Sequence, residues 1–327
     1  MKVLFIGGTG NISTSVSKLC IERGIDLYLL NRGTRSVEIP GAKIISGDIN
    51  SNETAKALKD HSWDAVVNWI AFVESDIERD INLFKGKTKQ YIFISSASIY
   101  QKPSTHPVIT ESTPLSNPFW DYSRNKIACE ERLNNAHRNE NFPITIVRPS
   151  LTYDTVIPLP IGGWTEYTII DRMKKGKKVI VHGDGTSLWT ITHAEDFAKG
   201  FVGLLGNRLA IGHAFNITSD EILTWDQIYR FVAEAAGTEA NIIHIASDFI
   251  CKHENSLTGS LIGDKAVSVI FDNTKIKRFV PDFVCTIPFS EGIKKTLAWF
   301  ETDPKRMIIK KETNEMMDKI IRAYKGK

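Results

Sequence analysis

The feature that most constrains the fold of this chain is the stretch VLFIGGTGNIS at residues 3–13. Four apolar residues, a length typical of a buried strand, run directly into Gly7, Gly8 and Gly10. Apolar residues then recur between positions 12 and 20 with the spacing of one helix face. The pattern predicts a strand, a tight turn and a helix that packs back on the strand, which is the repeating unit of a parallel sheet.

The same alternation of short apolar runs and helical segments continues to about residue 150. It predicts a series of strands at residues 3–6, 27–30, 43–46, 65–70, 91–95 and 144–147. Such a series, with helices between the strands, is typical of an open sheet covered on both faces. We therefore expect an α/β fold with a Rossmann-type doubly wound parallel sheet.

The composition changes after Pro149, where the stretch VIPLPIGGW at residues 156–164 predicts a loop that leaves the sheet. We expect a dinucleotide-binding domain over residues 1–150 and a smaller C-terminal lobe, mainly substrate-binding, over residues 151–327. Residues from about 190 to 220 are expected to return to the sheet. Within the lobe, Thr224 and Gln227 have the spacing of a capping box for a helix that starts at residue 225.

The glycine turn predicts a dinucleotide site. Glycines at this place let the backbone approach a pyrophosphate, whose charge then lies on the free N–H groups of the helix N-terminus. Counted against G-x-G-x-x-G, Gly8 and Gly10 match and Ser13 takes the third position, which implies slightly wider helix packing. The residues expected to contact the cofactor here are Gly7, Thr9, Gly10, Asn11 and Ile12.

The end of the second predicted strand bears on the choice between NAD and NADP. An acidic residue usually binds the ribose hydroxyls of NAD at this place, but here the strand runs into LLNRGTR. Asn31 cannot repel a 2′-phosphate, and Arg32 and Arg35 could pair with one. The sequence therefore favours NADP, with NAD as the alternative if both arginines are only solvated loop residues.

Two further strand ends predict contacts with the adenosine half of the cofactor. Asp48 is placed to accept a hydrogen bond from the adenine amino group, and Ile49 to cover the ring. Ile70 and Ala71 follow the fourth strand and would lie against the same half. All four could instead be ordinary core residues.

Tyr122 and Lys126 lie four positions apart in FWDYSRNKIACEERL, so they share one face of a predicted helix. The spacing alone is common, but Ser96 ends a preceding apolar strand at the sheet edge where such folds bind ligands. A phenol with a pKa near 10 is a poor base at neutral pH, and lowering it by about 3 units takes roughly 4 kcal/mol. The Lys126 charge can supply part of this, while Ser96 donates a hydrogen bond to the reacting oxygen.

With these motifs together, the chain resembles the extended or atypical short-chain dehydrogenase/reductases, the NAD-dependent epimerase/dehydratase-like proteins. The resemblance spans nearly the whole chain and rests on GGTGNIS, SSASIY, YSRNK, VRP and GDGTSLWTITHAEDFA. It implies catalytic roles for Ser96, Tyr122 and Lys126, with Lys126 also holding the nicotinamide ribose. It further implies that Pro149 and Ser150 line the nicotinamide side.

One position departs from the family pattern. Sugar-nucleotide enzymes of this kind usually have an arginine four places after the last glycine of GDG, where it grips the substrate pyrophosphate; here Trp189 stands there. Either the substrate is not a nucleotide diphosphate sugar, or another cation such as Arg172 or Lys174 takes the role. Trp164 and Trp189 are the expected substrate-binding aromatics, and the alternative is that they are core residues.

The leading hypothesis is an NAD(P)-dependent enzyme acting on a secondary alcohol or ketone, expected in a sugar or sugar-like substrate. The same branch contains chloroplast stem-loop-binding proteins, so an RNA-binding protein is one alternative and a non-catalytic NAD(P) sensor is another. The net charge of +3 is weak for nucleic-acid binding. A homodimer is compatible with the resemblance.

The remaining composition argues against metal catalysis and a membrane site. Eight histidines lack metal-ligand spacing, and the four cysteines form no C-x-x-C pair, so we expect no metal and reduced thiols. The N-terminal apolar run ends in glycines after four residues, which is too short for a signal peptide or a membrane span. We expect a cytoplasmic protein that binds a small molecule.

Overall fold

The computed structural model describes residues 1–33 and 37–326. In these residues the main sheet has seven parallel strands in the order β12-β7-β5-β4-β1-β2-β3. Their bounds are β1 Lys2–Ile6, β2 Asp26–Asn31, β3 Lys43–Ser46, β4 Ala65–Asn68, β5 Tyr91–Ile94, β7 Ile144–Pro149 and β12 Ala214–Ile217. Every predicted strand of the first 150 residues is present, and the predicted fold class is confirmed.

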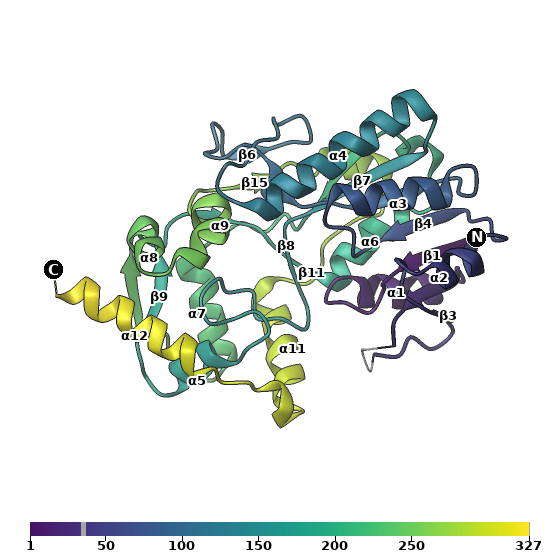
Figure 1. Ribbon diagram of the computed structural model, residues 1–327. Helices are drawn as coiled ribbons and strands as arrows, with labels where there is room; N and C mark the ends of the chain where they lie inside the picture. The colour runs from purple at the N-terminus through teal and green to yellow at the C-terminus, as the bar shows by residue number, and fades with distance from the viewer. Residues whose placement is uncertain (34–36, 327) are drawn as a thin grey trace.

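Helices cover both faces of the sheet (Figure 1). On one face α1 (Ser13–Glu22) packs beside α6 (Ala194–Leu204), and on the other α3 (Glu74–Phe84) packs beside α4 (Asp121–Glu140). Successive side chains of a strand point to opposite faces, so Val3 and Phe5 of β1 enter the first core and Leu4 and Ile6 the second. The second core also takes Leu58 of α2 (Asn52–Leu58).

The strand order reverses beside β1, and this reversal positions the site. The chain runs from β1 outward to β2 and β3, then returns to the other side of β1 at β4 and continues to β5, β7 and β12. The connections therefore diverge at the carboxyl ends of β1 and β4. Open α/β sheets bind ligands in the crevice that such a divergence leaves.

The rest of the chain builds a smaller helical lobe beside the sheet, on the left in Figure 1. Its core surrounds Trp225 and Tyr229, both fully buried. The helices that line this core are α5 (Thr168–Lys174), α7 (Trp225–Ala235), α8 (Ser247–His253), α11 (Phe289–Glu301) and α12 (Lys311–Lys325). α6 and β12, from the same half of the sequence, pack with the sheet instead.

Short elements complete the chain. The remaining strands are β6 Val108–Ile109, β8 Leu151–Tyr153, β9 Val179–His182, β10 Leu188–Trp189, β11 Ile191–His193, β13 Leu223–Thr224, β14 Ile242–Ile245 and β15 Ile270–Phe271. The remaining α-helices are α9 Thr258–Ser260 and α10 Thr274–Phe279, and a π-helical turn covers Leu261–Lys265.

The predicted capping box is confirmed at the start of α7. The backbone N–H of Gln227 donates to the Thr224 hydroxyl (3.2 Å), and the backbone N–H of Thr224 donates to the Gln227 amide oxygen (2.9 Å). Two donors that the first helical turn leaves free are thereby satisfied. Across residues 1–33 and 37–326, no helix has both the length and the apolar character that a bilayer crossing requires.

Candidate active site

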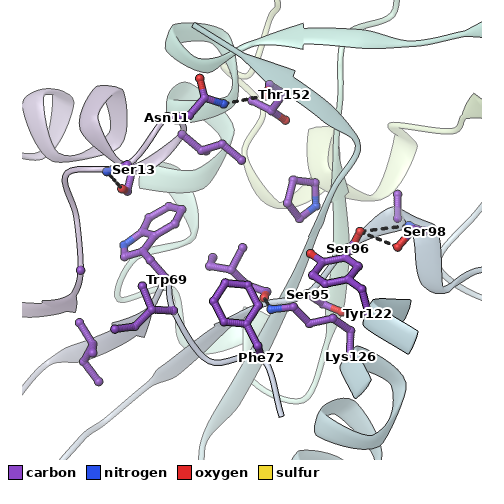
Figure 2. A pocket seen from close by; sticks show the side chains of 18 of the residues that line it. Asn11, Ser13, Trp69, Phe72, Ser95, Ser96, Ser98, Tyr122, Lys126 and Thr152 are labelled. Carbon is purple, nitrogen blue, oxygen red and sulfur yellow. Dashed lines mark hydrogen bonds between the residues drawn. The ribbon is translucent and has the colours of Figure 1, made fainter. Parts of the chain in front are cut away.

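A cavity of about 900 Å³ opens at the carboxyl ends of β1, β4 and β5. The glycine turn closes one side, the start of α4 another, and residues of the helical lobe the far end. Figure 2 shows Ser96, Tyr122 and Lys126 together on one side of this cavity, across from Asn11 and Ser13. The structure thus gathers residues that lie far apart in the sequence around one space.

The glycine turn has a backbone that requires glycine. Gly8 has a φ of +114°, and a Cβ atom there would lie 2.7 Å from Cδ2 of Leu29. Ser13, at the place of the third glycine, is buried and accepts a hydrogen bond from the Gly10 N–H (2.8 Å). α1 begins at Ser13 without a side-chain cap, and a helix start of this kind at a ligand cavity is suited to an anion.

Asn11 has a structural task that the sequence did not indicate. Its amide nitrogen donates to the Thr152 carbonyl (2.9 Å), and its amide oxygen accepts from the N–H groups of Asp154 (3.0 Å) and Thr155 (3.1 Å). These bonds join the glycine turn to the segment that leads into the helical lobe. Gly7, Thr9, Gly10 and Ile12, also predicted to contact a cofactor, line the cavity.

The predicted adenosine end is formed by the ends of β2, β3 and β4. Asn31, Arg32, Asp48, Ile49 and Ile70 line the cavity there. Ala71 does not line it, because its side chain packs in the second core of the sheet, and Arg35 lies outside the described residues. With its amide nitrogen facing the glycine turn, Asn31 donates to the carbonyls of Gly7 (3.0 Å) and Leu30 (3.1 Å).

Lys126 is held by the backbone at the base of the cavity. Its ammonium donates to the carbonyl oxygens of Ala71 (2.6 Å) and Ile94 (2.8 Å), and it lies 4.6 Å from the ring centroid of Phe72. Burial lowers the pKa of Lys126 to about 8. At pH 7 the ammonium form still predominates, and a negative charge beside it would favour this form further.

Tyr122 stands one helical turn before Lys126, and its ring centroid is 5.8 Å from the Lys126 ammonium. Burial raises the pKa of Tyr122, and the interaction with the Ser96 hydroxyl opposes this rise. Ser96 in turn shares a hydrogen bond with Ser98 (2.9 Å), whose hydroxyl reaches Ser123 (2.7 Å). Phenol, hydroxyl and ammonium thus lie on the same side of the cavity (Figure 2), an arrangement that can serve a proton transfer beside a bound ligand.

Pro149 and Ser150 line the cavity as well. Pro149 ends β7 and Ser150 follows it, and the carboxyl end of β7 neighbours that of β5 in the sheet. A ring bound there would lie between the turn and Tyr122. The geometry accordingly fits a cofactor that spans from the adenosine end to the phenol.

The two predicted substrate tryptophans differ in their surroundings. Trp164 lies at the cavity with 48% exposure and a φ of +63°, a backbone conformation that is unusual for a residue with a side chain. Trp189 also lines the cavity but is only 2% exposed, and its ring packs on Trp225 with centroids 5.6 Å apart. Trp189 is therefore both a member of the lobe core and part of the cavity wall.

The cations proposed to replace the missing arginine lie elsewhere. Arg172 donates to Asp318 of α12 (2.7 Å) and to the Lys178 carbonyl (2.9 Å), and Lys174 pairs with Glu301 (2.7 Å). Neither residue lines the cavity. Sequence reasoning missed the lysines that do line the cavity near Trp189, Lys102 and Lys265, because no local pattern marks them.

Sequence reasoning also missed Trp69, Phe72 and Trp120, which line the cavity. Trp69 directly precedes the predicted Ile70, and Trp120 directly precedes the helix of Tyr122, so proximity to a predicted residue was the available signal. In the described part of the chain, no group of three or more His, Cys, Asp or Glu side chains is arranged to hold a metal ion.

Comparison with known proteins places this site in a family. The sequence matches the NAD dependent epimerase/dehydratase family over residues 3–218, which include the glycine turn, Ser96, Tyr122 and Lys126. The chain belongs to this family. Its description as NAD dependent agrees with the predicted nicotinamide dinucleotide, but not specifically with NADP.

Two curated relatives illustrate how far the family reaches. The chain is 26% identical to the chloroplast stem-loop binding protein of 41 kDa b of Arabidopsis thaliana, over 74% of this chain and 65% of that protein. It is 30% identical to the UDP-glucose 4-epimerase of Lactobacillus helveticus, over 45% of this chain and 51% of that protein. The alignments thus span about half to two thirds of these relatives' own length.

Solved structures of the family share the fold. An epimerase from Methanothermobacter thermautotrophicus matches with a TM-score of 0.73 and 18% identity, over 94% of both chains. The UDP-glucuronic acid 4-epimerase of Bacillus cereus, in complex with UDP-glucuronic acid and NAD, matches with a TM-score of 0.72 and 18% identity, over 92% of this chain and 99% of that one. At this identity the likeness demonstrates a common fold.

Proposed function

We propose that the protein is an NAD(P)-dependent enzyme of the epimerase/dehydratase type that acts on a secondary alcohol or ketone of a sugar or sugar-like substrate. The observation that carries the proposal is the meeting of Ser96, Tyr122 and Lys126 at one end of a cavity whose other end is a glycine turn. Gly8 supports the proposal too: it lines the cavity, and its positive φ belongs to the kind of tight turn that lets a backbone approach a pyrophosphate.

In this proposal a nicotinamide held in the cavity would supply hydride transfer to or from the substrate carbon. Tyr122 moves the proton at the substrate oxygen, and Ser96 donates a hydrogen bond that holds this oxygen in line with the phenol. The Lys126 charge, 5.8 Å from the phenol ring, favours the phenolate. Its position beside the Ile94 carbonyl also lets it reach a ribose hydroxyl of the cofactor.

The decisive variant is Tyr122→Phe, which keeps the ring and removes the proton donor. We expect turnover to fall by about 10²–10⁴-fold, with cofactor affinity within a few-fold of wild type. Single-turnover hydride transfer and calorimetric titration with the cofactor measure the two quantities. Tyr324→Phe, on the exposed side of α12, is the matched control. Turnover above about a tenth of the wild-type value in Tyr122→Phe would exclude the acid/base role.

We further propose that NADP is preferred to NAD. Arg32 supports this, because its ion pair with Asp48 is long (3.8 Å) and its side chain is 65% exposed, so the guanidinium can turn toward a 2′-phosphate. Replacing Arg32 and Arg35 together with alanine should abolish the preference, since a charge-assisted contact contributes about 1.5–3 kcal/mol. Equal affinities of the wild-type protein for both dinucleotides would contradict the proposal.

A second function has one specific observation in its favour, the similarity to a protein named for binding chloroplast stem-loops. RNA binding through backbone phosphates would weaken steeply with salt. A gel-shift titration with a stem-loop RNA at two salt concentrations, in wild type and Tyr122→Phe, separates the functions. Tight, salt-dependent binding without any hydride transfer would favour the RNA-binding function.

We also propose a homodimer and a cytoplasmic location. The four cysteines are free, three of them buried, as expected where thiols stay reduced. The outer surfaces of α3 and α4, which pack side by side, are the proposed dimer face. Sedimentation equilibrium tests the dimer, and cell fractionation tests the location.

A further inference from the structure

Two lysines converge at the end of the cavity beyond Tyr122. The side chains of Lys102 and Lys265 are only 2% and 11% exposed, and both ammonium groups lie 5.9 Å from the ring centroid of Trp189. Both residues line the cavity. Buried ammonium groups are rare unless an opposite charge compensates them.

One carboxylate lies between the two ammonium groups. Asp264 pairs closely with Lys265 (2.9 Å), but its other oxygen is 3.9 Å from Lys102. Lys102 also donates to the Asp264 backbone carbonyl at 3.3 Å. Burial lowers the pKa of Lys102, and the Asp264 charge opposes this. With all three groups ionised, the cluster carries a net charge of about +1, so one further negative charge would balance it.

Hydrogen bonds to the backbone connect this cluster to the part of the cavity that contains Ser96. Asp264 and Lys265 end the π-helical turn Leu261–Lys265, a distortion that occurs often at functional sites. The Asn117 amide donates both to the Gly263 carbonyl of this turn (2.7 Å) and to the Ser98 carbonyl (2.8 Å), two residues from Ser96. The charge of Asp264 contributes to the raised pKa of Tyr122.

Trp189 and the π-helical turn form the surroundings of the two lysines. The indole N–H of Trp189 is buried and has no hydrogen-bond partner among the described residues. Gly263 lies close to Trp120, since a Cβ atom there would be 3.3 Å from the Trp120 Cβ, so the π-helical turn and the aromatic wall support each other. Two ammonium groups therefore lie beside the Trp189 ring in the cavity wall.

We propose that Lys102 and Lys265 bind a carboxylate of the substrate, so that the substrate is a polyhydroxylated acid of sugar size. This inference rests on the proposed function, because the carboxylate must lie within one small molecule's reach of Tyr122. Charge decides between anions: a carboxylate carries one charge and balances the cluster, whereas a phosphate monoester carries about −1.5 to −2 at pH 7 and leaves a buried excess. A nucleotide diphosphate would bring a comparable excess of negative charge. The site also lacks the arginine that usually binds it, since position 189 is a tryptophan.

The test uses the full chain saturated with NADP or NAD, titrated calorimetrically with D-glucuronate, D-galacturonate, glucose, glucose 6-phosphate and UDP-glucose. At least one uronate should bind more tightly than the other three compounds. Lys102→Met should weaken that binding tenfold or more while leaving cofactor affinity unchanged. Lys265→Gln is the second variant, and Lys175→Met, an exposed lysine of the helical lobe, is the matched control.

Three results would overturn the inference. They are uronates that bind no better than glucose, a phosphate or nucleotide sugar that binds more tightly than both uronates, and uronate binding that is unchanged in both lysine variants. Each of these results counts only if the protein used binds the cofactor with wild-type affinity. Loss of cofactor binding in the wild type, or full turnover in Tyr122→Phe, would instead count against the proposed function.

Discussion

At the scale of single residues, Lys126 shows a conflict between stability and function. Its side chain is 2% exposed, and burial lowers the pKa from its usual range near 10.4 to about 8. A shift of this size corresponds to about 3 kcal/mol of disfavour for the charged form. The two backbone carbonyls that accept from the ammonium leave this penalty in place. The lysine is costly for folding, and its position is explained by the proposed chemistry.

We therefore predict that Lys126→Met stabilises the cofactor-free protein at pH 7 by about 1–3 kcal/mol, the lost hydrogen bonds offsetting part of the gain. Urea denaturation measures the change. Cofactor affinity should fall at the same time, because the ammonium no longer reaches the ribose. Lys18→Met, at an exposed position of α1, is the control and should change neither quantity.

The difference in stability between Lys126→Met and the wild type should depend on pH with a definite sign. The folded-state pKa of Lys126 is lower than its unfolded-state pKa, so the unfolded protein holds more protons between about pH 8 and pH 10.4. Wild-type stability gains from this residue as pH rises through that window, and the advantage of Lys126→Met should shrink. A constant difference from pH 7 to pH 10 would contradict the assigned environment.

Single residues also show where sequence reasoning reaches its limit. Tyr122 and Lys126 could be predicted as neighbours because helix geometry alone brings positions four apart onto one face. Lys102 and Asp264 meet although 162 positions separate them, through a loop and a π-helical turn that no periodic pattern marks. Trp189 could be placed at the cavity from the family pattern, but its packing on Trp225 could not. Tertiary contacts between irregular segments are the part that the sequence did not reveal.

At the scale of elements, the turn from β1 to α1 is limited by space as well as by backbone conformation. A Cβ atom at Gly8 would meet Leu29 of the neighbouring strand β2 at 2.7 Å, and the Gly8 carbonyl accepts from the Ser17 hydroxyl (2.8 Å). Strand, turn and helix are therefore packed without room for a methyl group. The strands were predictable because their apolar runs are buried between two helical layers, while the close approach at Gly8 depends on the partner strand.

We predict that Gly8→Ala destabilises the protein by about 2–5 kcal/mol, the sum of a strained positive φ and an overpacked contact. Cofactor affinity should also fall, since the turn must shift to admit the methyl group. Gly24→Ala is the matched control: Gly24 has a φ of +69° but no atom within 4 Å of a built Cβ, so it carries only the backbone strain. Similar losses of stability in both variants, measured by urea denaturation, would refute the crowding at Gly8.

At the scale of the whole molecule, a few polar side chains join the sheet to the helical lobe. Asp196 of α6 accepts from the N–H groups of Thr286 (3.0 Å) and Ile287 (2.8 Å), just before α11. Glu221 accepts from the N–H of Phe289, the first residue of α11 (2.7 Å). Asn11 makes a further connection, and it does so from within the glycine turn. The position of the lobe and the order of the turn are thereby linked.

Two substitutions at Asn11 separate these roles. Asn11→Ala removes three hydrogen bonds and leaves the N–H groups of Asp154 and Thr155 without this acceptor, so it should cost about 2–3 kcal/mol of stability. Asn11→Asp keeps an acceptor for both N–H groups and should lose less stability, but its charge lies beside the expected pyrophosphate and should weaken cofactor binding more than alanine does. Asn139→Ala, at an exposed position near the end of α4, is the control. Urea denaturation ranks the two variants by stability, and cofactor titration ranks them by affinity. We expect opposite rankings, with alanine the less stable variant and aspartate the weaker binder. The same ranking in both measurements would show that Asn11 acts on only one of the two properties.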